Sequence, residues 1–282
     1  MRFNTRALAL SLLLVVSPAL SAATIDLGEG AATGPAALQS IGPLAFGPDG
    51  ILFAADSLGG AIFALDTKDT EPSTGDGLNI EGLNEQVAAL LGTTVDDIQI
   101  IDLAVNPLSK RAYFSVSRGQ GPDAQAVLLR TSNDGSLENV ALDNIHHSRA
   151  ELPNPPDPEA ERRGRSLRLE TITDLGYAEG RLLATGLSNE EFSSKFRTLE
   201  FPFGSVSSGT SVDIFHGAHG RWETYAPIRT FALYDIGTAP HVLAAYTCTP
   251  LVQFPLKSLK PGAKIRGTTL AELGNRNRPL DM

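Results

Sequence analysis

The chain has 282 residues, of which 42% are hydrophobic and 20% are charged. This composition is that of a globular protein with material for a large core, and it excludes a fibre and an intrinsically disordered chain. The formal net charge of −9 repels phosphate backbones, so no nucleic-acid partner is expected.

The N-terminus has the organisation of a secretory signal peptide. Two arginines are followed by the apolar run ALALSLLLVV (residues 7–16), and then by small side chains at the spacing of a cleavage site. The run is too short for a transmembrane helix, which needs about 20 residues. No later segment approaches that length, so no membrane span is expected. We therefore predict a signal peptide over residues 1–23 and an exported protein, periplasmic or secreted, that begins near Thr24.

The sequence contains one cysteine, Cys248, and no C-x-x-C-H motif for covalent haem attachment. An exported chain without disulfides fits a bacterial periplasm and a core that is large enough alone. No Lys, Arg or His is adjacent to Cys248 to lower the pKa of its thiol, so an inert side chain is expected.

A β-hairpin is predicted at residues 51–66 (ILFAADSLGGAIFALD), where two short apolar runs flank a glycine-bearing turn. Residues 241–256 (HVLAAYTCTPLVQFPL) align with it without a gap, and residues 111–131 and 181–203 repeat the plan with longer turns. The four hairpins begin at intervals of 61, 69 and 60 residues, at Ile51, Ala112, Arg181 and His241.

Each hairpin follows another short strand and a Gly, Pro or Asp turn, as in PLAFGPDG and ITDLGYAEG. Such repeats predict an all-β propeller, in which antiparallel meander blades follow one another around an axis and bury their faces against their neighbours. The period exceeds the roughly 40–50 residues of compact blades, so segments are inserted. Residues 81–92 predict a short helix capped by Gly92. The proline-rich, charged residues 146–170 predict an exposed, mobile loop, with His146 and His147 solvated.

The last residues, RPLDM (278–282), resemble the strand openings QIIDL and TITDL. This resemblance predicts four blades and the start of a fifth, so that residues 24–282 form a single propeller domain, truncated at its C-terminus and incomplete as a ring. ATIDLG (residues 23–28) is then the candidate strand that completes a final blade. The alternative is a shorter complete protein with a helical tail.

Residues 41–66, IGPLAFGPDGILFAADSLGGAIFALD, resemble the repeat of the NHL and SMP-30/gluconolactonase six-bladed propellers, from the Gly-Pro pair to the final strand ending in Leu-Asp. The matching residues belong to turns and strands, so the resemblance implies a fold rather than an activity. In the gluconolactonase branch it would imply a divalent cation in the central channel, with a glutamate before the Gly-Pro pair and an asparagine in a Pro-Asn-Gly motif as ligands. Ile41 stands at the first position and the motif is missing. An alkyl group cannot coordinate a cation, so a lactonase is disfavoured.

Three aspartates, Asp102, Asp174 and Asp281, occupy equivalent places in the predicted inner strands, which line the axial channel of a propeller. A ring of carboxylates could hold Ca²⁺ or a cationic ligand, so Asp102 and Asp174 are candidate metal ligands. The alternative is structural. Each aspartate would then accept hydrogen bonds from nearby backbone N–H groups and fix the register between blades.

The segment DIFHGAHGRWETYAPIRTF (residues 213–231) combines histidines, arginines and the only tryptophan with glycines that favour a turn. Because aromatic and arginine side chains give large contact areas, we predict a ligand-binding face. Its residues are His216, His219, Arg221 and Trp222. The alternatives are a zinc site at His-x-x-His and packing of Phe215, Trp222 and Tyr225 between blades. The cluster RRGRSLR (162–168) either contacts an acidic partner or is a solvated loop.

Two functions of different classes remain. The first is a non-catalytic binding or scaffold module that presents inserted loops to a protein or a small-molecule ligand, with no cofactor required. The second is an enzyme that uses the axial channel, as a metal-dependent, lactonase-like hydrolase or a quinoprotein-like enzyme. Ile41, the missing asparagine motif and the absent haem motif favour the first.

Overall fold

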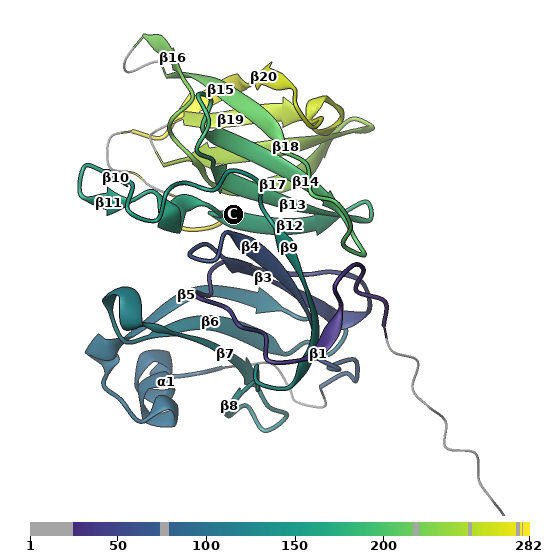
Figure 1. The fold of residues 1–282 in the computed structure, drawn as a ribbon, viewed down its shortest axis with the longest axis vertical. Helices are drawn as coiled ribbons and strands as arrows, with labels where there is room; N and C mark the ends of the chain where they lie inside the picture. The colour runs from purple at the N-terminus through teal and green to yellow at the C-terminus, as the bar shows by residue number, and fades with distance from the viewer. Residues whose placement is uncertain (1–24, 74–78, 217–219, 248–249, 275–276, 278) are drawn as a thin grey trace, which may run out of the picture.

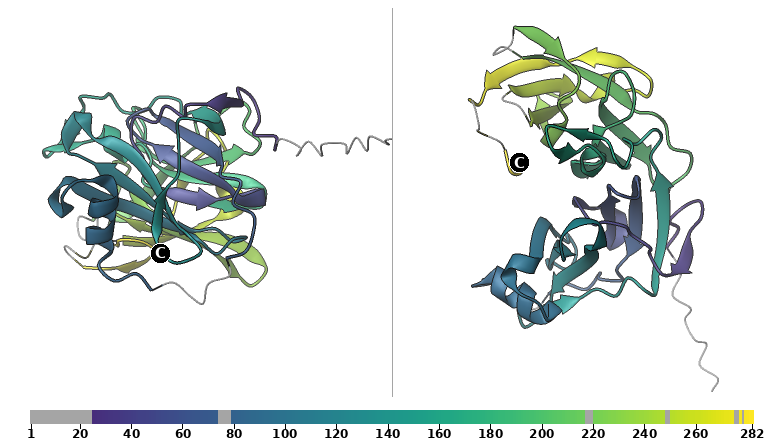
Figure 2. Two further views of the ribbon diagram at one scale, coloured as in Figure 1. Left: turned by 90° about the horizontal axis from the view of Figure 1, so that it is seen from below. Right: turned by 60° about the vertical axis from the view of Figure 1, so that its left-hand side comes forward.

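The computed structural model describes residues 25–73, 79–216, 220–247, 250–274, 277 and 279–282. The predicted signal peptide and Cys248 lie outside the described residues. Four main antiparallel sheets stand side by side in a C-shaped arc, with their innermost strands in contact near a common axis (Figures 1 and 2). The predicted all-β propeller architecture is therefore present, as four blades in an open ring.

Blade 1 has five strands. From the axis outwards they are β2 (Leu44–Phe46), β3 (Ile51–Asp56), β4 (Ala61–Asp66), β9 (Ile145–Glu151) and β1 (Ala32–Gly34). Every residue of β3 and β4 is buried, because both faces of this sheet are covered by neighbouring blades. A strand buried on both faces reads as a continuous apolar run, which is why the hairpin at residues 51–66 stood out in the sequence.

Blade 2 has four strands and the predicted helix. The strands are β5 (Ile98–Val105), β6 (Ala112–Arg118), β7 (Gln125–Thr131) and β8 (Leu137–Asn139). Helix α1 (Leu83–Leu91) packs Val87 against Phe114 and Val116 of the sheet, and Gly92 ends it in the left-handed conformation, as predicted. Short 3₁₀ turns are η1 (Pro48–Gly50), η2 (Val95–Asp97) and η3 (Gly121–Asp123).

Blades 3 and 4 complete the arc. Blade 3 contains β12 (Asp174–Ala178), β13 (Arg181–Leu187), β14 (Ser194–Glu200), β15 (Thr210–His216) and β16 (Arg221–Glu223), with β20 (Lys264–Arg266) parallel to β15. Blade 4 contains β17 (Ile228–Ile236), β18 (Ala239–Tyr246), β19 (Pro250–Pro255) and β21 (Thr268–Glu272), with η6 at Leu256–Ser258. Three of the four predicted hairpins begin as expected, at Ile51, Ala112 and Arg181, and the fourth begins at Ala239 instead of His241.

The order of the blades differs from their order in the chain. After β4 the chain builds the whole of blade 2 and then returns as β9, which pairs with β4 from Ala61↔Glu151 to Asp66↔His146. Blade 2 is thus inserted into blade 1, and the spatial order is 2, 1, 3, 4. The prediction of blades in chain order is wrong because the last strand of blade 1 lies at residues 145–151, within the segment predicted to be a loop.

Strand β9 also corrects the prediction for His146 and His147. Both side chains are half-buried within the sheet, where His146 Nε2 lies 3.2 Å from the carbonyl oxygen of Ile25. Between them and the strand end, Ser148 and Ala150 are buried. The strand escaped notice because few of its buried positions carry large apolar side chains.

Apolar clusters join each pair of neighbouring blades. Each interface contains at least one aromatic pair, with ring centroids 5.1 Å apart for Phe46 and Tyr113, 5.7 Å for Phe53 and Tyr177, and 5.3 Å for Phe196 and Phe231. Such pairs add about 0.5–1.5 kcal/mol beyond the burial of their surface. No blade covers its apolar faces with its own residues alone, so each blade depends on its neighbours for stability.

The N-terminal segment does not complete a final blade. Leu27 is fully buried between blades 1 and 3, and Gly28 forms a parallel bridge with Phe203. The backbone of Glu29 donates to the carbonyl of Phe203 at 2.8 Å. The expectation for residues 23–28 is therefore wrong, because Leu27 finds its apolar partners at the 1–3 interface.

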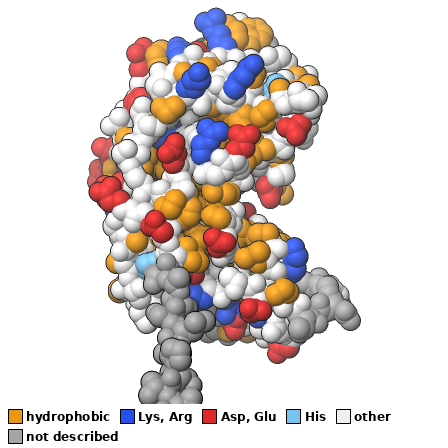
Figure 3. Space-filling view, turned by 90° about the vertical axis from the view of Figure 1, so that its right-hand side faces the viewer, with side chains coloured by type: hydrophobic (Ala, Val, Ile, Leu, Met, Phe, Trp, Pro, Cys, Tyr) orange, Lys and Arg blue, Asp and Glu red, His pale blue; other side chains and the backbone are white. Residues whose placement is uncertain are grey.

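Acidic and basic side chains lie interspersed on the face shown in Figure 3, which offers no uniform field of one sign. Within the described part of the chain, no helix combines the length and the apolar character needed to cross a membrane.

Candidate functional site

The axial aspartates link the inner strands of neighbouring blades. Asp102 of β5 accepts a hydrogen bond from the backbone N–H of Leu44 in blade 1, at 2.7 Å. Asp174 of β12 accepts from the N–H of Phe231 in blade 4 and from that of Leu175, both at 2.8 Å. These are the contacts that the structural alternative predicted.

Burial dominates the electrostatics of this pair. Loss of hydration raises the pKa of Asp102, against the backbone hydrogen bond from Leu44. The same cause raises the pKa of Asp174 to about 7, and the negative charge of Asp102 adds to it. Among the described residues, no three His, Cys, Asp or Glu side chains are grouped so that they could hold a metal ion. A Ca²⁺ ion at Asp102 and Asp174 stays a prediction.

The predicted binding face on residues 213–231 is a hairpin formed by β15 and β16, in which His216 pairs with Arg221. His219 lies outside the described residues, as do the side chains of His216 and Arg221. Trp222 is 44% exposed, and the guanidinium carbon of Arg266 lies 4.6 Å from its ring centroid. A ligand-binding role for these four residues stays a prediction.

Phe215, Trp222 and Tyr225 do not pack between blades. Phe215 is 41% exposed and Tyr225 is 54% exposed, and Phe215 contacts Trp222 edge-on, with ring centroids 5.7 Å apart. The packing alternative is wrong because the hairpin lies at the outer edge of blade 3, where no further sheet covers it.

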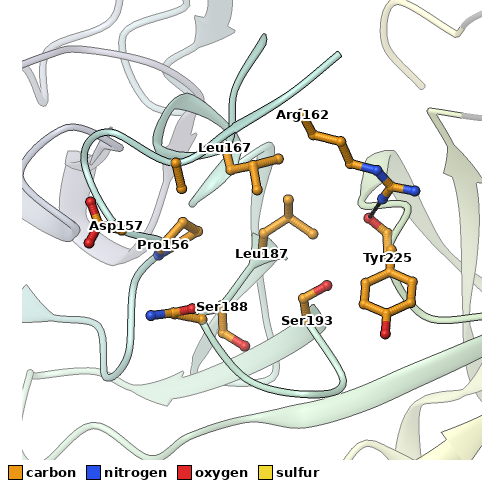
Figure 4. A pocket seen from close by; sticks show the side chains of 10 residues that line it. Pro156, Asp157, Arg162, Leu167, Leu187, Ser188, Ser193 and Tyr225 are labelled. Atoms are coloured by element: carbon orange, nitrogen blue, oxygen red, sulfur yellow. Dashed lines mark hydrogen bonds between the residues drawn. The ribbon is translucent and has the colours of Figure 1, made fainter. Parts of the chain in front are cut away.

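A pocket of about 290 Å³ lies between the inserted segment that follows β9 and the end of blade 3 (Figure 4). Pro156, Ala160, Arg162 and Leu167 of the inserted segment line one side, with Asp157. The connection from β13 to β14 lines the other side, through Leu187, Ser188, Asn189 and Ser193. Tyr225, which follows β16, completes the lining.

The inserted segment is tied to the body of the protein at several points. It contains the small hairpin β10 (Glu161–Arg162) and β11 (Arg165–Ser166), followed by η4 (Arg168–Glu170). Arg168 donates to the carbonyls of Leu58 in blade 1, at 2.9 Å, and of Pro156, at 2.8 Å. The predicted loop is exposed at residues 161–165, as expected, but it contains a short hairpin and is held to blade 1. Arg168 is a structural anchor rather than a solvated charge.

Arg162 lies at the rim of the pocket. Its guanidinium carbon is 5.5 Å from the ring centroid of Tyr225, and Nη1 donates to the carbonyl oxygen of Tyr225 over 3.5 Å (Figure 4). In the described part of the chain Arg162 has no ion-pair partner. Most of the five guanidinium donors are therefore open to a ligand.

A second arginine lies behind the pocket wall. Arg197 of β14 is 1% exposed, and its Nη2 donates to the carbonyl oxygen of Leu187 at 3.0 Å. Burial lowers the pKa of Arg197 to about 10, so the group remains positively charged at neutral pH. The nearby carboxylate of Glu190 is engaged by Lys195, whose Nζ lies 2.5 Å from it.

Three buried hydroxyls in or beside the pocket lack a hydrogen-bond partner among the described residues. They belong to Ser188, Ser194 and Thr224. A buried hydroxyl without a partner costs about 1–3 kcal/mol, so such groups are satisfied by a ligand or by water. Of these three residues Ser188 lines the pocket, which thus combines apolar walls, an open cation and one buried hydroxyl without a described partner.

Comparison with known proteins gives no relative by sequence. No protein-family model matches the chain, and no curated protein matches it. Among solved structures, a luciferin-regenerating enzyme aligns at 8% identity over 84% of this chain and 99% of its own, with a TM-score of 0.30. A putative oxidoreductase (glucose dehydrogenase) from Thermus thermophilus aligns at 14% identity, over 90% and 72% of the two chains, with a TM-score of 0.28. The PQQ-bound aldose sugar dehydrogenase from Streptomyces coelicolor aligns at 12% identity, over 86% and 84%, with a TM-score of 0.24.

These scores carry no argument about function, and the fold rests on the strand pairing described above. Sequence reasoning had singled out residues 162–168 and Tyr225 separately, but not their meeting at one pocket. It missed Leu187, Ser188 and Arg197. Charged residues at alternate positions of SKFRTLE (194–200) are typical of a half-solvated strand, and nothing local reveals that Lys195 and Arg197 are buried.

Proposed function

We propose that this chain is an exported, non-catalytic β-propeller that binds a small organic ligand in the pocket between the inserted segment and blade 3. The observation that carries the proposal is the lining itself. Residues 156–167, residues 187–193 and Tyr225 converge there, and together they supply apolar walls, an open guanidinium and a buried hydroxyl without a described partner.

The chemistry of the lining supports binding over catalysis. Ser188, Ser193 and Tyr225 carry the hydroxyl groups in the lining, which contains no His, Lys or Cys to serve as a general base or a thiol nucleophile. The carboxylate of Asp157 accepts from the backbone N–H of Glu159 at 3.0 Å. The axial carboxylates Asp102 and Asp174 are likewise occupied by backbone N–H groups.

The resemblance of residues 41–66 to the NHL and SMP-30 repeat supports a place in that superfamily of propellers. Ile41 is 2% exposed and packs in the apolar cluster between blades 1 and 2. The position at which the gluconolactonase branch has a metal-binding glutamate is therefore a core position in this chain. This supports a binding module rather than a metal-dependent lactonase.

A ligand-induced rise in melting temperature tests the proposal. The probe is 2-phenylethanol, a neutral molecule small enough for the pocket, and the variants are Ala160→Phe, which fills the pocket, and Ala141→Phe, which adds the same bulk at an exposed site of blade 2. We expect the probe to stabilise the wild type and Ala141→Phe but not Ala160→Phe. Equal stabilisation of Ala160→Phe, or no stabilisation of the wild type by this probe or its charged analogues, would refute the proposal.

A further inference from the structure

We infer that the ligand of this pocket is a small organic anion with an apolar body, the charge of which is bound by Arg162. The inference rests on the proposed function and names the chemical class of its ligand. The inference follows from the apolar walls of the pocket, from the positive charge of Arg162 at its rim, and from the position of the one carboxylate in its lining.

The apolar body follows from the walls. Pro156, Leu167 and Leu187 face one another across the pocket in Figure 4, and the aromatic ring of Tyr225 lies near its edge. An inorganic ion would leave these groups without contact. A ligand that buries an aromatic or branched alkyl group removes their apolar surface from water, which is the main source of affinity in such sites.

The sign of the ligand charge follows from Arg162. It is the cation of the lining, and its described contacts are the ring of Tyr225 and one long hydrogen bond to a carbonyl. The lining also contains Asp157, but Figure 4 shows that its carboxylate points away from the other labelled side chains. The pocket thus presents one open positive charge and no inward negative charge, which favours a carboxylate or a similar anion.

Arg197 strengthens this bias from behind the wall. Its guanidinium donates to the carbonyls of Leu187 and Thr171, neither of which neutralises its charge. Glu190, the carboxylate that acts on Arg197, is shared with Lys195, so the three groups together carry one net positive charge. In a buried site such a charge is weakly screened, so it repels a cationic ligand and attracts an anionic one.

Three nearly isosteric probes separate charge from shape: phenylacetate, 2-phenylethanol and 2-phenylethylamine. Titration calorimetry on the mature protein should give phenylacetate the highest affinity, at least about tenfold above 2-phenylethylamine. Acetate, which keeps the charge and lacks the ring, should bind far more weakly than phenylacetate.

The matched variants are Arg162→Gln and Arg163→Gln. Both remove one charge from the same exposed hairpin, but only Arg162 lines the pocket. We expect Arg162→Gln to weaken phenylacetate about tenfold and to leave 2-phenylethanol unchanged, whereas Arg163→Gln leaves both unchanged.

The outcomes distinguish this inference from the proposed function. Equal binding of the three probes, or an unchanged phenylacetate affinity in Arg162→Gln, overturns the inference that the ligand is an anion, while the pocket remains a binding site. Equal affinity for acetate and phenylacetate overturns the inference that the ligand has an apolar body. Failure of all three phenyl probes to bind overturns the proposed function itself.

Discussion

Asp174 makes the stability of the propeller depend on pH in a direction opposite to that of an ion-paired carboxylate. It lies at the start of β12 and accepts the N–H of Phe231 across the interface between blades 3 and 4. Burial raises the pKa of its carboxyl group from 3.8 to about 7. Between these two values the folded chain holds a proton that the unfolded chain has lost, so the free energy of unfolding falls as pH rises.

The size of the effect follows from the two pKa values. Between pH 5 and pH 8 the linkage relation gives a loss of at most about 3 kcal/mol from this one group, and little further loss above pH 8. Asp174→Asn removes the titration. The amide oxygen of the asparagine can still accept from one backbone N–H group, but its NH₂ group then faces the other N–H group and cannot accept from it. The lost hydrogen bond lowers the free energy of unfolding by about 1–2 kcal/mol at every pH.

Urea unfolding followed by circular dichroism at pH 5, 6, 7 and 8 measures the difference between wild type and variant. We expect the wild type to lose about 3 kcal/mol more than Asp174→Asn over this range. Glu200→Gln removes an exposed carboxylate from the same blade and should retain the wild-type slope. If wild type and Asp174→Asn lose stability in parallel, the reasoning about this buried carboxyl group is refuted.

Three further predictions concern other parts of the chain. Asp69 is buried and accepts hydrogen bonds from a tyrosine, a serine and an arginine. Asp69→Ala should therefore lower the free energy of unfolding in urea by about 3–5 kcal/mol, whereas Asp143→Ala, at an exposed site, should lower it by less than about 0.5 kcal/mol. Gly28→Ala would place a Cβ 2.1 Å from the carbonyl oxygen of its bridge partner, Phe203, and should lower the free energy of unfolding by more than about 2 kcal/mol. The control is Gly30→Ala, where nothing lies within 4 Å of the added Cβ, and it should lower the free energy of unfolding by about 1 kcal/mol or less. Equal losses in the two variants would contradict the close contact at Gly28. N-terminal sequencing of protein recovered from an exporting host should begin near Thr24, and an intact N-terminus would contradict export by a cleaved signal peptide.

The parts of the fold that could be predicted from sequence are those in which burial leaves a local trace. Both faces of β3 and β4 are covered, so residues 51–66 are continuously apolar, and α1 ends at a glycine in the left-handed conformation. Strand β9 leaves no such trace, because its buried positions include Ser148 and because His146 contacts the distant backbone of Ile25. Its partner strand is set by chain topology, which local patterns do not encode.

The candidate site was predictable only in fragments. The basic residues 162–168 and the aromatic Tyr225 were each conspicuous, but their meeting depends on how the inserted segment is held by Arg168 against blade 1. The burial of Arg197 depends on segments distant in the sequence that pack against both faces of its strand, β14. Neither fact is a property of any stretch of about ten residues, which is the length that periodicity and motif arguments cover.

The insertion of blade 2 into blade 1 has a consequence for how the chain is made. As the polypeptide emerges, β4 has an unpaired edge that stays bare until residues 145–151 arrive, after the whole of blade 2 has been synthesised. An unpaired edge of apolar sequence can pair with other chains, so rapid folding of blade 2 shortens the time during which the nascent chain can aggregate. Blade 1 cannot be completed before blade 2 has been synthesised, because its strand β9 follows blade 2 in the chain.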